Sequence, residues 1–217
     1  MNKERKIALI TGSAKGIGKA IASELAAENY DVIINYLHSQ DAAESLCQTI
    51  QDTYHVNCMA LQGDVSKEEE VDTLFTTIEK TLGVVDVLVN NAAIDLSNLF
   101  QLKTAEEFRR TLDVNVIGAY NCAKRAGKPM ITQEYGRIIN ISSTNGMNTY
   151  YPMSIDYDVS KAALNALTHD LAMQYAPYVN VNCIAPGFIG TESELDGYDE
   201  EFLKQECEKI LVERYGE

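Results

Sequence analysis

Near its N-terminus the 217-residue chain reads Ile7-Ala8-Leu9-Ile10-Thr11-Gly12-Ser13-Ala14-Lys15-Gly16-Ile17-Gly18, an apolar run followed at once by closely spaced glycines. The run predicts a buried strand, and the residues from 16 to 28 predict a helix. Glycines let the backbone turn sharply and approach a ligand without a Cβ in the way. The N–H groups at the start of such a helix favour a pyrophosphate. A plain strand-to-helix turn is the alternative interpretation.

The remaining chain repeats this strand-helix alternation. Strands are expected at 7–11, 31–36, 57–62, 86–89, 137–142 and 179–184, and helices at 16–28, 41–52, 68–81, 104–124, 157–175 and 200–214. Alternation with buried, Val/Ile-rich strands predicts an α/β fold: a doubly wound parallel sheet of six strands in three α/β/α layers. No Pro/Gly/Ser-rich linker divides residues 1–217, so we expect a single dinucleotide-binding domain.

Composition excludes several classes of protein. The formal net charge is −14, which argues against nucleic acid or an anionic membrane as the main partner. The five cysteines include no Cys-x2-Cys pair, so we expect reduced, buried thiols rather than a disulfide framework or a zinc site. No apolar stretch has the length of a secretion signal or a membrane span, and a cytoplasmic location is expected.

The end of the second predicted strand bears on cofactor identity. It reads Asn35-Tyr36-Leu37-His38-Ser39, with no acid before Asp41. An acid there accepts from the ribose 2′-OH of NAD and would repel a 2′-phosphate. Its absence favours NADP(H), with Lys15 supplying positive charge and Ser39 or His38 further donors. A solvated loop lysine is the alternative for Lys15.

Two further strand ends carry polar or small residues. Asp64, before Val65, can accept from an adenine amino group, and Asn90-Asn91-Ala92-Ala93 lets the chain pass under a ribose. Both lie at the carboxyl ends of predicted strands, where ligands bind in this architecture.

Tyr157 and Lys161 are four residues apart on a predicted helix and therefore share one face. A free tyrosine has a pKa of about 10, and a nearby ammonium lowers it. The phenol can then protonate a carbonyl oxygen as hydride arrives, or accept the alcohol proton in the reverse direction. A surface pair without function is the alternative, because this spacing is common by chance.

Ser142 and Ser143 end the fifth predicted strand, where one hydroxyl can hold the substrate oxygen. Strand alternation should point the two in opposite directions, and Ser143 is preferred. Asn115 is a polar residue in an apolar helical stretch. It is either a satisfied buried amide or the site of a helix kink that seats a water beside Lys161.

These motifs, together with Asn182-Cys-Ile-Ala-Pro-Gly187, occur in the order typical of the classical short-chain dehydrogenases/reductases, and the chain resembles that family over nearly its whole length. The details look most like the 3-oxoacyl-[acyl-carrier-protein] reductase branch. The resemblance implies NADPH-dependent carbonyl reduction by a homo-oligomer, with the catalytic tetrad Asn115, Ser143, Tyr157 and Lys161. The cofactor-binding residues it implies, with those argued above, are Gly12, Ser13, Lys15, Gly16, Ile17, Gly18, Tyr36, Ser39, Asp64, Val65, Asn91, Ala92, Ala93, Tyr157, Lys161, Pro186, Gly187, Ile189 and Thr191.

Two departures from the family matter. Ala93 stands where the family has glycine, and its methyl group either is absorbed or crowds the cofactor. The family also continues past Gly216 with a helix and a seventh strand. We therefore expect an exposed sixth strand, with reduced stability or an altered dimer or tetramer. A catalytically inactive dinucleotide-binding or scaffold protein is the alternative function.

The sequence does not identify the substrate. An acyl-carrier protein is acidic, so a charge of −14 disfavours it unless a basic patch exists, for which Lys124-Arg125, Lys128 and Arg109-Arg110 are candidates. Sugars, steroids and small ketones are alternatives. Residues 188–215 are the expected substrate lid, with Tyr198 and Phe202 as apolar contacts.

Overall fold

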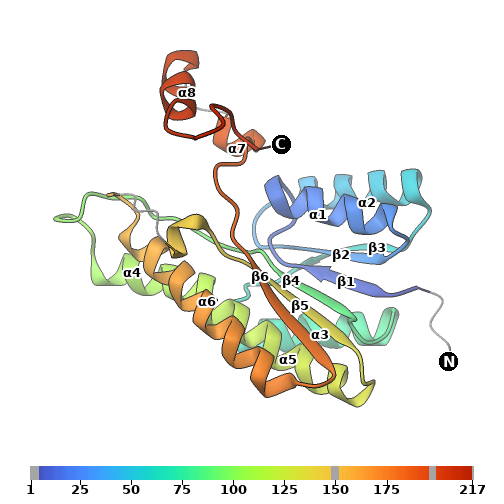
Figure 1. Ribbon diagram of the computed structural model, residues 1–217. Helices are drawn as coiled ribbons and strands as arrows, with labels where there is room; N and C mark the ends of the chain where they lie inside the picture. Colours follow the sequence, from blue (N-terminus) through green and yellow to red (C-terminus); the bar gives the residue numbers. More distant parts are fainter. Residues whose placement is uncertain (1–4, 148–151, 196–198, 217) are drawn as a thin grey trace.

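The computed structural model describes residues 5–147, 152–195 and 199–216. Six parallel strands form one sheet, as the sequence predicts, and their order in the sheet is β3-β2-β1-β4-β5-β6 (Figure 1). The strands are β1 (Ile7–Ile10), β2 (Asp31–Tyr36), β3 (Cys58–Gln62), β4 (Val87–Asn90), β5 (Gly136–Ile141) and β6 (Val179–Ile184). The order reverses between β1 and β4, so their carboxyl ends flank the crevice where ligands bind in such sheets.

Helices cover both faces of the sheet (Figure 1). Helices α1 and α2 lie on one face, and α3, α5 and α6 on the other. Their bounds, with those of the shorter helices, are α1 (Gly16–Ala27), α2 (Gln40–Tyr54), α3 (Glu68–Thr81), α4 (Ala105–Leu112), α5 (Gly118–Thr132), α6 (Ile155–Tyr175), α7 (Glu192–Leu195) and α8 (Glu200–Cys207). None of the helices in the described residues is long and apolar enough to span a membrane.

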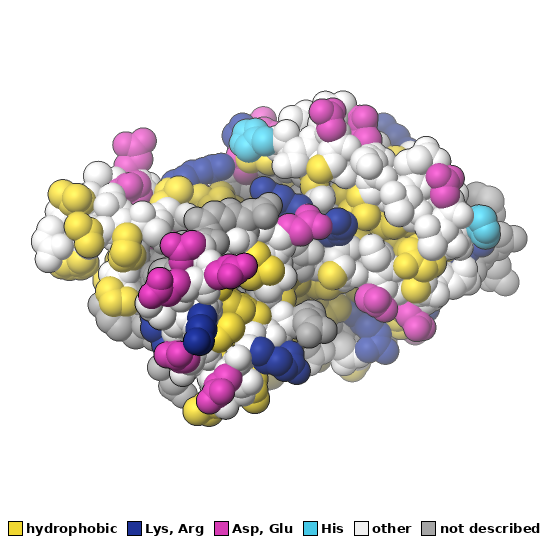
Figure 2. All heavy atoms as spheres, turned by 90° about the horizontal axis from the view of Figure 1, so that it is seen from above, with side chains coloured by type: hydrophobic (Ala, Val, Ile, Leu, Met, Phe, Trp, Pro, Cys, Tyr) yellow, Lys and Arg dark blue, Asp and Glu magenta, His cyan; other side chains and the backbone are white. Residues whose placement is uncertain are grey.

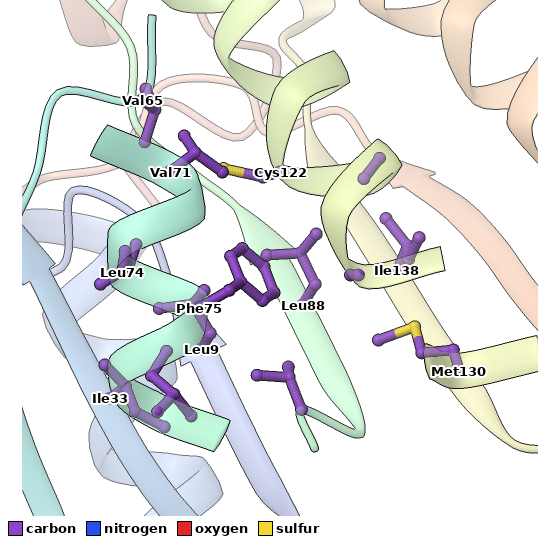
Figure 3. Close-up of a cluster of buried hydrophobic side chains, with 14 of the residues drawn as sticks. Leu9, Ile33, Val65, Val71, Leu74, Phe75, Leu88, Cys122, Met130 and Ile138 are labelled. Carbon is purple, nitrogen blue, oxygen red and sulfur yellow. The ribbon is translucent and has the colours of Figure 1, made fainter. Parts of the chain in front are cut away.

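Each face of the sheet has its own hydrophobic core. In the core under α3 and α5, Phe75 lies near Leu9 and Leu88, and Ile138 belongs to the same cluster; all four are at most 1% exposed (Figure 3). Burying one such side chain contributes about 1.5–3 kcal/mol. These two cores hold the strands in register, and the register places the loops that carry the candidate site.

One predicted helix is interrupted. The stretch 104–124 forms α4, then a π-helical turn over Asp113–Ile117, and then α5, which runs on to Thr132. A capping box starts α4, because the Thr104 side chain accepts from the Glu107 N–H and the Glu107 carboxylate accepts from the Thr104 N–H. The helix is therefore irregular at Asn115, which lies in the π turn.

The chain after β6 differs from prediction. A single helix over 200–214 was expected, but α8 ends at Cys207, and the short α7 precedes it. Figure 1 shows both helices standing away from the sheet. β6 pairs with β5, and among the described residues no strand pairs with its other edge. The side chain of Ile184, at the end of β6, is 53% exposed.

Candidate active site

The loop between β1 and α1 is a backbone cradle whose shape depends on glycine. Gly12 and Gly16 have φ angles of +60° and +59°, in the left-handed region that other residues rarely adopt. A Cβ on Gly18 would lie 2.6 Å from Nδ2 of Asn91 and 2.8 Å from Cα of Ser13. The space that a Cβ would fill, with the first N–H groups of α1, fits a pyrophosphate.

Neighbouring strands fix this cradle. The Asn35 side chain accepts from the Gly12 N–H at 3.2 Å and donates to the Gly63 carbonyl at 3.1 Å. The Thr11 hydroxyl oxygen accepts from the N–H groups of Asn91 and Ala92, each at 3.0 Å. The loops after β1, β3 and β4 and the end of β2 are thus joined into one unit at the carboxyl edge of the sheet.

Several predicted cofactor residues have inward-facing roles in this unit. The Ser13 hydroxyl is fully buried and donates to the Ile10 carbonyl at 2.7 Å, so it holds the turn closed. Val65 is buried against α5, where a Cβ on Gly118 would lie 2.6 Å from its Cγ2. Tyr36 is 8% exposed at the end of β2. From the sequence alone it cannot be decided whether these residues would contact a cofactor through the backbone or whether their side chains shape the loop.

The polar residues at the ends of β1 and β2 are accessible. Lys15 is exposed and directly precedes α1. His38 is exposed, and Ser39 is half-buried just before α2. β1 and β2 are adjacent, so these groups lie at the same corner of the sheet. Ala93 is exposed, so its methyl group is not packed into the protein.

Asp64 is held in its ionised form. Burial opposes ionisation, but hydrogen bonds from the Ser66 hydroxyl and N–H outweigh it, and the Arg110 guanidinium adds to them, so the pKa of Asp64 lies below its usual value. Arg110 contacts the carboxylate at 3.3 Å. The carboxylate already has three donors within the protein.

A cavity of about 570 Å³ connects the glycine loop with the segment after β6. Its lining includes five predicted cofactor residues: Gly16, Ile17, Pro186, Ile189 and Thr191. The Cγ2 atom of Thr191 lies 3.8 Å from where a Cβ on Gly16 would stand. Gly187, between Pro186 and Ile189, is exposed. The structure thus joins two motifs that are about 170 residues apart in the sequence.

Helix α6 presents Tyr157 and Lys161 one turn apart. The Lys161 Nζ lies 5.3 Å from the centroid of the Tyr157 ring and donates to the Ile141 carbonyl at 2.7 Å. Lys161 is 2% exposed, and burial lowers the pKa of its amine to about 8. Tyr157 is only half-buried, so its ring is accessible beside a buried ammonium.

The two serines after β5 point in different directions, as strand alternation predicts. Ser142 is buried, and its hydroxyl donates to the Lys161 carbonyl at 3.1 Å. Ser143 is half-buried, and its hydroxyl oxygen accepts from the Asn145 N–H at 3.2 Å. Among the described residues no acceptor takes the Ser143 hydroxyl hydrogen, whereas Ser142 supports the backbone of α6.

Asn115 lies in the π-helical turn, and its buried amide has hydrogen-bond partners at both polar atoms. Its Oδ1 accepts from the Ile94 N–H at 2.8 Å, and its Nδ2 donates to the Ile94 carbonyl at 2.9 Å and to the Ser160 hydroxyl at 3.0 Å. The π turn therefore positions one side chain to hold the loop after β4 against α6. Ser160 was missed by the sequence argument, although it lies between Tyr157 and Lys161.

Sequence reasoning also missed a buried group of residues around Asp156, which directly precedes Tyr157. Lys103 and Asp156 form an ion pair of 2.8 Å, and their side chains are 4% and 0% exposed. The Thr111 hydroxyl donates to Asp156 at 2.6 Å, and Lys103 also donates to the Leu96 carbonyl. Burial opposes the charge of Asp156, but these donors hold its pKa below the usual value. The only sequence feature that points to this buried ion pair is the acidic residue directly before Tyr157.

The segment after β6 closes on itself at its base. Gly216 donates to the Phe188 carbonyl and accepts from Gly190, each at 2.9 Å, and the rings of Phe188 and Tyr215 meet edge to face at 6.2 Å. The expected lid therefore has paired ends. The apolar contacts expected there are not described: Tyr198 and the Phe202 side chain lie outside the described residues.

Three of the five residues considered for a basic patch are neutralised by acidic side chains. Lys124 and Arg125 form ion pairs with acidic residues of α3, and Arg110 pairs with Asp64. The face of the molecule in Figure 2 likewise carries acidic and basic side chains next to each other. These cations do not form a free positive surface.

The six-stranded doubly wound sheet with this site is that of the short chain dehydrogenases, and the chain belongs to that family, whose model matches residues 6–200. The chain is 35% identical over 216 residues to the 3-oxoacyl-[acyl-carrier-protein] reductase FabG of Staphylococcus aureus (strain Mu50 / ATCC 700699), covering 99% of the chain and 87% of the relative. The solved structure of ElxO with NADP bound has a TM-score of 0.89 at 34% identity, covering 98% of the chain and 86% of that structure. NAD+-bound xylitol dehydrogenase has a TM-score of 0.90 at 30% identity, covering 100% and 88%. The chain is thus an oxidoreductase of this family, with relatives that bind either nicotinamide cofactor.

Proposed function

We propose that the protein reduces a carbonyl to an alcohol with NADPH, using Tyr157 as the proton donor. The observation that carries this proposal is the accessible Tyr157 ring 5.3 Å from the buried Lys161 Nζ. Both lie at the carboxyl edge of the sheet, where Lys161 bonds to the last residue of β5. A carbonyl reduction needs a proton at the oxygen and a hydride at the carbon, and the site supplies the first.

The chain's own residues have separate roles in this proposal. The Ser143 hydroxyl donates to the substrate carbonyl oxygen and fixes its position. Tyr157 then transfers its phenolic proton to that oxygen, and the Lys161 ammonium stabilises the phenolate that remains. Asn115 keeps α6 and the loop after β4 in place through its three hydrogen bonds. NADPH, when bound, supplies the hydride.

The preference for NADPH rests on charge at the cofactor corner. β2 is followed by no acid before Asp41, and the exposed Lys15 lies at the end of the neighbouring glycine loop. A 2′-phosphate there meets a cation and no carboxylate. The ElxO structure with NADP supports this assignment, and the NAD+-bound xylitol dehydrogenase shows that related chains differ.

Cofactor preference is tested by measuring the dissociation constants of NADPH and NADH by fluorescence, with no substrate present. Lys15→Ala should weaken NADPH binding about tenfold, because it removes one charge-assisted contact, and leave NADH binding nearly unchanged. Lys80→Ala, at an exposed lysine of α3, is the control. Tighter binding of NADH than NADPH by the wild type contradicts the proposal.

For the substrate, we propose a 3-oxoacyl thioester or a related ketone. The FabG relatives support an acyl substrate. The loop before α4 carries exposed apolar side chains, with Leu99, Phe100 and Leu102 at 54%, 66% and 62%. This loop reaches the start of α6, because the Asn98 N–H donates to the Met153 carbonyl at 2.9 Å. An apolar acyl chain fits that surface, and the segment 188–215 would close over it as a lid.

A substrate series tests this assignment. β-Ketoacyl esters of increasing chain length are offered with NADPH, and absorbance at the cofactor band is followed. We expect kcat/KM to rise with chain length. NADPH binding without turnover of any carbonyl would defeat the enzyme assignment. Turnover of polar sugars alone would support the enzyme assignment but contradict the proposed acyl substrate.

A further inference from the structure

Two cysteines meet at the contact between α2 and β3. The Sγ atoms of Cys47, on α2, and Cys58, on β3, are 2.6 Å apart, and the two residues are 7% and 6% exposed. Both are reduced thiols in this structure. A second contact holds the same two elements together, because Gln51 Nε2 donates to the Cys58 carbonyl at 2.9 Å.

We propose that Cys47 and Cys58 are a redox site that forms a reversible intramolecular disulfide when the protein meets hydrogen peroxide. A disulfide requires side chains that point at one another, with sulfurs about 2.05 Å apart. The thiols already face each other in adjacent elements, so closure needs a movement of about half an ångström. The other three cysteines have no thiol partner among the described contacts, since Cys122 lies in the opposite core and Cys183 bonds to Asn165 and Ile184.

The opposite pKa shifts of the two thiols favour Cys47 as the attacking sulfur. The hydrogen bond with Cys58 lowers the pKa of the Cys47 thiol and outweighs the opposing effect of burial. The same hydrogen bond and burial raise the pKa of Cys58. Since the thiolate is the nucleophile, Cys47 reacts first and Cys58 resolves the product.

The reaction balances with peroxide as the only oxidant. The Cys47 thiolate attacks one peroxide oxygen, an S–O bond forms and the O–O bond breaks, and the leaving hydroxide takes up a proton as water. The Cys58 sulfur then attacks the Cys47 sulfur, the S–S bond forms, the S–O bond breaks, and the second hydroxide leaves as water with the Cys58 proton. Two thiols are oxidised by two electrons, and one peroxide is reduced to two waters.

The disulfide would fasten a helix to a strand at one end of the sheet. β3 is the terminal strand of the described sheet, and α2 begins directly after Ser39. Only residues 48–57 separate the two cysteines, so the crosslink closes a short loop of the unfolded chain. We expect the oxidised protein to melt at a temperature about 5–10 °C above the reduced one.

The full chain is treated with graded hydrogen peroxide, quenched, unfolded and titrated for free thiols. The expected result is a fall from five thiols to three, reversed by dithiothreitol. Chymotrypsin cuts after Tyr54, between the two cysteines, so mass spectrometry should find the fragments joined until reduction. The melting temperature is recorded for both forms.

Matched variants distinguish a disulfide between Cys47 and Cys58 from unspecific oxidation of the other cysteines. Cys207→Ser should behave as the wild type and fall from four thiols to two. Cys47→Ala and Cys58→Ala should each give no joined fragments, with circular dichroism establishing that they fold. Five intact thiols, a Cys47 oxidised to sulfinic acid without a crosslink, or a crosslink through Cys183 or Cys207 would each overturn the proposal.

Discussion

The Nζ atom of Lys161 lies 5.3 Å from the centroid of the Tyr157 ring, while its hydrogen bond runs to the carbonyl of Ile141. The amine is therefore held by the sheet and faces the ring as a fixed cation. Its pKa of about 8, lowered by burial, keeps it mostly charged near neutral pH. A fixed cation beside a phenol favours the phenolate without needing to move during the reaction.

Removing the phenolic hydroxyl tests this arrangement. Tyr157→Phe should lower kcat by about 10²–10⁴-fold, the usual contribution of a general acid, while NADPH binding stays within about threefold of the wild type. Steady-state kinetics and cofactor titration measure the two effects. Tyr178→Phe, at an exposed tyrosine before β6, is the control and should retain full activity. Undiminished turnover by Tyr157→Phe would rule out the proposed proton donor.

The buried amine also predicts how stability depends on pH. The pKa of Lys161 is about 8 in the fold, below its ordinary 10.5, so between these values the unfolded chain carries a proton that the fold does not. Stability rises with pH wherever the unfolded state binds more protons. Relative to Lys161→Met, the wild type should gain about 2 kcal/mol of unfolding free energy between pH 7 and pH 9.5.

Urea denaturation of both proteins at the two pH values measures this difference, and groups common to both cancel in the subtraction. Carbonyl reduction should decline over the same range as the ammonium loses its charge. Parallel stability curves for the wild type and Lys161→Met would show that burial does not lower the pKa of this amine.

Sequence reasoning succeeded where the relevant interaction is local or periodic. The strand-helix alternation and the left-handed glycines act within a few residues, so they predicted the sheet and the turn before α1. It did not find the partners of Asn115, because Ile94 and Ser160 come from elements 21 and 45 residues away. It also offered Lys124 and Arg125 as candidates for a basic patch, whereas folding brings the acids of α3 onto them.

The glycine cradle makes a steric prediction. A Cβ on Gly18 would lie 2.6 Å from Asn91 Nδ2 and 2.8 Å from the Ser13 backbone, so Gly18→Ala forces the loop to shift. We expect a loss of about 1–3 kcal/mol of stability and at least tenfold weaker NADPH binding. Gly63→Ala is the matched control, since its Cβ would meet only ordinary contacts of 3.6 and 3.8 Å. Equal effects of the two substitutions would contradict the close approach at Gly18.

The buried pair of Lys103 and Asp156 predicts a non-additive result. Among the described residues, Lys103→Met leaves the fully buried Asp156 carboxylate with the Thr111 hydroxyl as its remaining side-chain donor, and should cost about 3–5 kcal/mol of unfolding free energy. Asp156→Leu alone leaves the lysine uncompensated and should cost a similar amount. The double variant removes both charges, and an apolar pair avoids the desolvation of two ions. It should therefore be more stable than either single variant.

Activity distinguishes a structural pair from a positioning one. Lys103 also bonds to Leu96, and Asp156 directly precedes Tyr157, so the pair ties the apolar loop before α4 to the helix that carries the proton donor. The double variant recovers stability but lacks the contact between the loop before α4 and α6. KM for the carbonyl should therefore rise more than kcat falls. Chemical denaturation and steady-state kinetics on all four proteins complete the cycle. If the single losses simply add in the double variant, the two charges do not interact across the buried contact.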